Sequence, residues 1–130
     1  MTAEHAGRPN RRAASALATD FALVLVFAAL GRRSHAEGLT LAGVASTGWP
    51  FLTGTAVGWL LCRGWRQPTA LLPTGIAVWL STVAVGMLIR KASGAGTAAS
   101  FIVVTTLVTG VFLLGWRVLR RWRSTRHQSS

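Results

Sequence analysis

Long apolar segments separated by short polar ones are the main pattern of this chain. Three of the four segments carry no charged residue, and the first carries only Asp20. An α-helix rises about 1.5 Å per residue, so each segment is long enough to cross a bilayer. We predict an all-α, integral membrane four-helix bundle over residues 13–116, with spans at about 13–31, 40–62, 70–89 and 97–116. Basic tails at residues 1–12 and 117–130 flank it.

Proline and glycine positions inside the segments predict how the helices pack. Pro50 lacks a backbone donor and predicts a kink in the second span. Gly54 and Gly58 form a small-residue pair that lets two backbones approach closely, either inside the bundle or at a seam with a second copy. Gly86 in the third span is a further packing position. Similar Arg-containing helix ends recur along the chain, so two related helical hairpins are an open interpretation beside ordinary alternating spans.

Basic residues collect at the span ends and give a formal net charge of +11. Four spans place both tails and the 63–68 loop on one side, with ten basic residues against four on the other. Because such residues concentrate in the cytoplasm, we expect both termini there, in a multi-pass plasma-membrane protein. The basic tails would contact anionic lipid headgroups. Trp65, Trp116 and Trp122 would belong to the aromatic belt of this side.

Composition excludes several other functions. The chain is 51% hydrophobic and 13% charged, which is typical of a membrane bundle and not of a soluble domain. Its charge would suit nucleic acid, but no fold motif or spaced basic surface supports that partner. Cys62 is the only cysteine, which excludes an intramolecular disulfide and a cysteine-based metal site. No phosphate-binding loop or hydrolase motif occurs, so we expect no catalytic residues, no metal and no cofactor.

Asp20 lies about 10 Å inside the first span. Intramembrane carboxylates are costly and usually face the bundle interior. One interpretation is a titratable group that binds a proton or a cation. The other is structural, a salt bridge or cap near the cytoplasmic face, with Arg117 or Arg63 reaching inward.

A second polar group falls at the opposite end of the spans. Arg32, Ser34, His35 and Arg90 could converge on an anion such as a phosphate headgroup, with His35 as a proton relay. They could equally form a solvated loop that sets topology. Trp79, near the middle of the third span, either packs in the core or lines a cavity.

Several of these residues together resemble a known family. They are Asp20, Gly31, Arg32, Ser34 and His35, then Trp49-Pro50-Phe51, Trp79, Gly86 with Arg90, and Trp116-Arg117. The pattern is similar to that of a four-span bacterial and archaeal membrane family, the domain of unknown function 3054, over about residues 16–118. The resemblance implies signature positions and no activity.

Three hypotheses about function remain open at this point. The first is a membrane protein that binds or moves a small solute, ion or lipid headgroup through the residues named above, with no enzymatic step. The second is an accessory or structural subunit, as a homo-oligomer or with another membrane protein, that makes contacts through Gly54, Gly58 and the basic tail. The third is a proton-coupled exporter similar in architecture to the small multidrug resistance family, with Asp20 as the coupling group.

Overall fold

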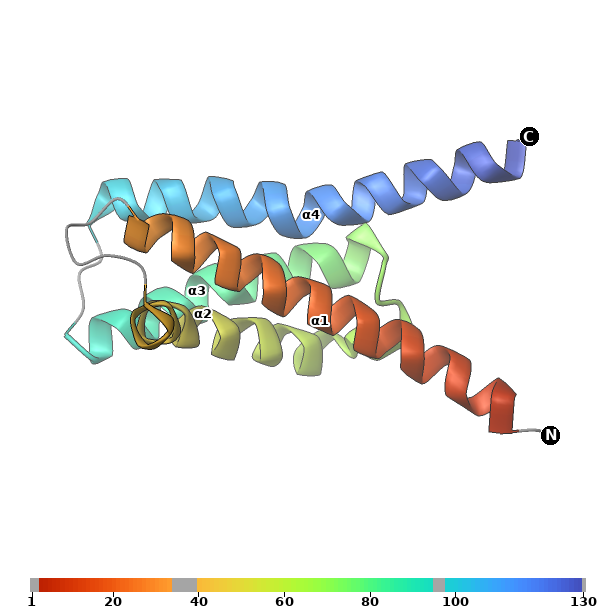
Figure 1. Ribbon diagram of the computed structural model, residues 1–130, viewed down its shortest axis with the longest axis horizontal. Coiled ribbons are helices and arrows are strands. Elements are labelled where there is room, and N and C mark those ends of the chain that lie inside the picture. Colours follow the sequence, from red (N-terminus) through yellow and green to blue (C-terminus); the bar gives the residue numbers. More distant parts are fainter. Residues whose placement is uncertain (1–2, 34–39, 95–97, 130) are drawn as a thin grey trace.

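The computed structural model describes the backbone of residues 3–33, 40–94 and 98–129, and the side chains of 11–31, 40–94 and 98–123. Four helices make up most of it: α1 (Ala3–Arg33), α2 (Leu41–Cys62), α3 (Ile76–Ala92) and α4 (Ala99–Ser129). They lie side by side, and both chain termini lie at the same end of the bundle (Figure 1). We call this end the termini end and the opposite one the loop end. The predicted all-α bundle is confirmed.

The described helix ends follow from local chemistry. The Thr40 hydroxyl accepts a hydrogen bond from the backbone N–H of Gly43 at 3.0 Å, which satisfies a donor that the first turn of α2 leaves open. Arg63 ends α2 in the left-handed conformation, with φ 53°. A 3₁₀ turn (η1, Gly64–Arg66) and a π-helical turn (η2, Leu71–Gly75), broken at Leu72, then lead into α3.

Three helical segments are long and apolar enough to cross a membrane, namely Arg11–Gly31 in α1, Leu71–Ala92, which joins η2 to α3, and Ala99–Arg123 in α4. The second helix does not reach that apolarity, because glycine, threonine and proline replace many of its aliphatic positions. Its first turns are seen nearly end-on in Figure 1, whereas the remainder runs along the other helices. Pro50 lies inside α2, and a missing backbone donor is a common cause of such a bend. That α2 forms a fourth span stays a prediction.

Glycines bring α2 and α3 into backbone contact. A Cβ atom at Gly54 would lie 2.6 Å from the carbonyl oxygen of Ser81, and one at Gly58 would lie 2.9 Å from the Cα of Val78. The Ser81 hydroxyl donates to the Gly54 carbonyl at 2.7 Å, which ties the two helices together. The Gly54–Gly58 face is therefore a seam inside the bundle, so it cannot also be the contact surface of an accessory subunit or a second copy.

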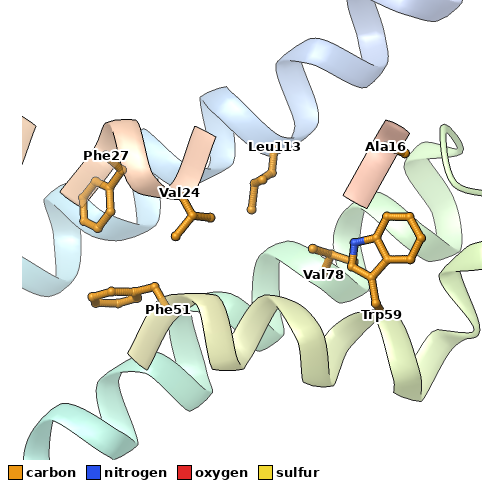
Figure 2. Packing of buried hydrophobic residues seen from close by; sticks show 7 residues of the cluster. All are labelled: Ala16, Val24, Phe27, Phe51, Trp59, Val78 and Leu113. Carbon is orange, nitrogen blue, oxygen red and sulfur yellow. The ribbon is translucent and has the colours of Figure 1, made fainter. Parts of the chain in front are cut away.

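The core between the helices combines a small apolar cluster with buried polar groups. Its fully or nearly buried hydrophobic members are Ala16, Val24, Phe27, Phe51, Trp59, Val78 and Leu113. Figure 2 shows Phe27 above Phe51 at one end of this cluster and Trp59 at the other. Many large aliphatic side chains point outward instead, as expected for a bundle whose solvent is lipid.

Candidate functional site

Asp20 is completely buried and forms the centre of a polar cluster at the termini end. Its carboxylate is paired with the guanidinium of Arg117, which is also fully buried, at 2.7 Å between Nη2 and Oδ2. A second bond runs from Nη1 to Oδ1 at 2.9 Å, so the pair is bidentate. Of the two arginines expected within reach of Asp20, the structure selects Arg117. Arg63 is exposed and caps α2.

Two tryptophans complete the coordination of the carboxylate. The indole N–H of Trp59 donates to Oδ2 at 2.8 Å, and that of Trp116 donates to Oδ1 at 2.8 Å. A carboxylate has about four lone-pair sites, and four donors now occupy them. We call Asp20, Trp59, Trp116 and Arg117 the Asp20 cluster.

Backbone carbonyls hold the arginine from its other sides. Arg117 donates from Nε to the carbonyl of Pro68 at 3.1 Å and from Nη1 to that of Leu113 at 2.9 Å. Its guanidinium carbon also lies 4.7 Å from the centre of the Trp116 ring. The close fit extends to Gly75, where a Cβ atom would lie 3.1 Å from Cδ of Arg117.

The cluster joins elements that are far apart in the sequence. Asp20 comes from α1, Trp59 from the end of α2, and Trp116 and Arg117 from α4, while the loop before α3 supplies the Pro68 carbonyl. The ion pair thus links α1 to α4, and the hydrogen bond from Arg117 to the Pro68 carbonyl links α4 to the loop between α2 and α3. Burying two charges costs several kcal/mol per ion before pairing, and only good geometry with further hydrogen bonds offsets it.

Two residues at the end of the fourth predicted span reach into the bundle. Trp116, expected in an interfacial belt, points its N–H to the buried carboxylate because α4 turns that face toward α1. Arg117 follows the predicted span boundary, and its side chain is buried in the bundle, as the salt-bridge interpretation of Asp20 expected. The helix continues without a break through this position to Ser129.

Buried hydroxyls form a second polar group nearer the middle of the bundle. The hydroxyls of Thr55 and Thr82 lie 2.8 Å apart across the α2–α3 seam. Each also donates within its own helix, to the carbonyls of Phe51 and Val78 respectively. On α4, Thr109 donates to the Thr105 carbonyl at 2.6 Å. We call Thr55 and Thr82 the hydroxyl pair.

Thr105 differs from these threonines. It is fully buried, and its hydroxyl has no hydrogen-bond partner among the described residues. A buried polar group without a partner costs about 1–3 kcal/mol.

An aromatic stack closes the core toward the loop end. The rings of Phe27 and Phe51 meet edge to face at 5.5 Å, and Phe101 lies 6.2 Å from Phe51. Gly86 makes room for the Phe51 ring, which a Cβ atom there would overlap. The guanidinium of Arg90 lies 4.4 Å from the centre of the Phe101 ring.

The remaining residues predicted at the loop end fall partly outside the described structure. Ser34 and His35 are not among the described residues, and only the backbone of Arg32 is described. Convergence of these residues with Arg90 on an anion therefore stays a prediction. Trp79 packs between α3 and α4, where its N–H donates to the Thr106 carbonyl at 3.0 Å and its ring crosses Gly110.

Sequence reasoning missed the two indole donors and the threonines. Trp59 stands about one turn from the termini end of its helix and Asp20 about two turns inside the first predicted span, so both lie in the same half of the bundle. A buried indole N–H needs an acceptor, so this shared half was a usable signal. The threonines gave none, because a hydroxyl can bond to its own helix anywhere in a span.

Chemically, the arrangement is a closed ion pair. The four donors leave no acceptor site on Asp20 for a further ligand unless the cluster opens. Among the described residues, no group of three or more His, Cys, Asp or Glu side chains could hold a metal ion.

Comparison with known proteins identifies a family for this chain. The model of a family described as a protein of unknown function, DUF3054, matches residues 17–120, which include the whole Asp20 cluster. No curated protein and no solved structure matches the chain.

Proposed function

The chain belongs to the DUF3054 family, and from the geometry of its core we propose that it is a membrane protein that binds or moves a small solute or ion. The fully buried Asp20–Arg117 pair carries the proposal. Apolar side chains of similar volume would hold α1 against α4 at least as well, since buried ion pairs are weak contributors to stability. A charged pair inside membrane-length helices is therefore better explained as a group that exchanges partners.

The order of side chains along α2 supports a path with two closed ends. Phe51, Thr55 and Trp59 follow at intervals of one turn on its buried face, so they span about 12 Å of the bundle. Phe51 belongs to the aromatic stack, Thr55 to the hydroxyl pair and Trp59 to the Asp20 cluster. We propose that the stack and the cluster are gates and that the hydroxyl pair lies between them.

Opening the Asp20 cluster requires a charged or strongly polar solute. Four donors would lose their acceptor if Asp20 moved away alone, so an entering group has to replace the carboxylate or the guanidinium. An anion would bind Arg117 in place of Asp20, and a cation would bind Asp20 in place of Arg117. The proposal is for binding or transport without a catalytic step.

The two alternative hypotheses are weaker on the same geometry. A proton-coupled exporter adds a requirement to the opening of the cluster, because the carboxylate released from its four donors would also have to exchange a proton for the substrate. An accessory subunit could not use the Gly54–Gly58 face as a contact surface, because that face packs against α3.

Thiol accessibility tests the path without knowledge of the solute. In a Cys62→Ala background, Thr82→Cys places a thiol at the hydroxyl pair. We expect slow labelling by a membrane-impermeant thiosulfonate reagent, and faster labelling from the termini side once Arg117→Gln opens the cluster. Leu107→Cys, which faces outward on α4, is the matched control and should stay unlabelled in both backgrounds. Unchanged slow labelling of Thr82→Cys after Arg117→Gln would exclude a path.

A further inference from the structure

The basic segment at the end of α4 is a direct extension of the membrane-length helix. Arg120, Arg121 and Arg123 are exposed, and so is Trp122 between them. The helix is continuous from Ala99 to Ser129, so this segment is fixed in direction by the buried turn that carries Arg117. It projects from the bundle at the termini end (Figure 1).

The loop between α2 and α3 adds basic and aromatic groups at the same end. The bond from Arg117 Nε to the Pro68 carbonyl, 3.1 Å long, places this loop against α4 one turn before Arg120 and Arg121. Arg63, Arg66 and Trp65 of the loop are exposed. Together the exposed residues form what we call the basic band, comprising Arg63, Trp65, Arg66, Arg120, Arg121, Trp122 and Arg123.

Little acidic charge is left to balance this band. The chain has three acidic residues against fourteen basic ones. Asp20 is buried and committed to Arg117. The other two are Glu4 and Glu37, whose side chains lie outside the described part of the chain. At most two carboxylates of the chain therefore remain for the five arginines of the band, so the band keeps a net positive charge.

We propose that the basic band binds the phosphate of an anionic phospholipid headgroup. Guanidinium groups bind phosphate oxygens in pairs, and half-exposed tryptophans beside them are suited to the headgroup level of a bilayer. The band stands where membrane-length helices end, which is the depth of lipid phosphates. This position favours lipid over nucleic acid, which would need the band to extend away from the membrane.

Lipid selectivity of the full-length protein in detergent micelles tests the proposal. Tryptophan quenching is titrated with brominated phosphatidylglycerol and, separately, with brominated phosphatidylcholine. We expect the wild type to prefer phosphatidylglycerol and to lose that preference at high salt. Each basic residue near a lipid surface contributes about fivefold to binding, so Arg120→Gln/Arg121→Gln should lower the preference by about twentyfold or more.

A control with the same loss of charge separates a binding band from general attraction. Arg11→Gln/Arg12→Gln removes the same charge from exposed positions on α1, outside the band, and should lose clearly less of the preference, because these arginines have no share in the set of guanidinium and indole groups proposed to hold one phosphate. Arg120→Lys/Arg121→Lys keeps the charge without the paired donors, so its preference for phosphatidylglycerol should fall between those of the wild type and the glutamine variant. This variant keeps the proposal testable if Arg120→Gln/Arg121→Gln does not fold. Equal losses in both glutamine variants, or no preference in the wild type, would overturn the proposal. So would displacement of the lipid by equimolar inorganic phosphate or by an oligonucleotide, since either would identify a different ligand.

Discussion

Alanine at Gly54 should force α2 and α3 apart. The new Cβ atom would lie 2.6 Å from the Ser81 carbonyl oxygen, and 2.8 Å and 2.9 Å from Cα and O of Thr82. All three are backbone atoms, so no side-chain rotation can relieve the overlap. Overpacking of this kind costs about 1–3 kcal/mol, and more where backbones meet. Replacing a helical glycine with alanine returns up to about 1 kcal/mol. We expect a net loss of about 1–2 kcal/mol.

The assay is unfolding of the purified protein in mixed micelles with increasing dodecyl sulfate, followed by circular dichroism. Gly115→Ala is the control, because a Cβ atom there meets nothing within 4 Å. It should be neutral or stabilise the helix by about 0.5–1 kcal/mol. If Gly54→Ala proves as stable as Gly115→Ala, the close α2–α3 contact is wrong.

Two further substitutions test the core by the same unfolding assay. Thr105→Val removes a buried hydroxyl that has no described partner and should stabilise the bundle by about 1 kcal/mol. Thr109→Val removes a hydroxyl that has a hydrogen-bond partner and should not stabilise the bundle. A loss of stability in Thr105→Val would show that its hydroxyl is bonded after all. Phe51→Ala should cost about 3–5 kcal/mol of stability. Gly86→Ala alone should also destabilise the bundle, but added to Phe51→Ala it should recover part of the loss, because its Cβ atom fills space that the ring leaves. Simple additivity of the two losses would show that the two residues do not share space.

The four helices could be predicted from the sequence because blocks of apolar residues require little else, although α1 begins at Ala3 and α4 runs to Ser129, each well beyond the predicted span. The glycine pair and Pro50 also predicted local effects that depend on backbone geometry alone. The exact extent of α4 was harder. Arginines after residue 116 suggest the end of a span, but a helix continues wherever its backbone hydrogen bonds are satisfied, and Arg117 turns inward to a buried partner.

The Asp20 cluster could be predicted only in part. A single carboxylate in a span requires a cation, and the sequence offered two candidates at the right depth. Which one pairs, and which indoles join it, depends on side chains separated by 39, 96 and 97 positions in the chain. Such convergence is fixed by how α1, α2 and α4 rotate against one another, and helical periodicity within one segment does not specify it.

The ion pair between α1 and α4 is the central claim, and a double-mutant cycle measures it most directly. Asp20→Asn and Arg117→Gln each leave one buried charge without its partner and should each cost about 3–5 kcal/mol in the unfolding assay. The double variant leaves no such charge, so its loss should fall short of the sum by about 2 kcal/mol or more. Losses that add to within about 0.5 kcal/mol would contradict the account, because they would mean that Asp20 and Arg117 do not interact in the folded protein.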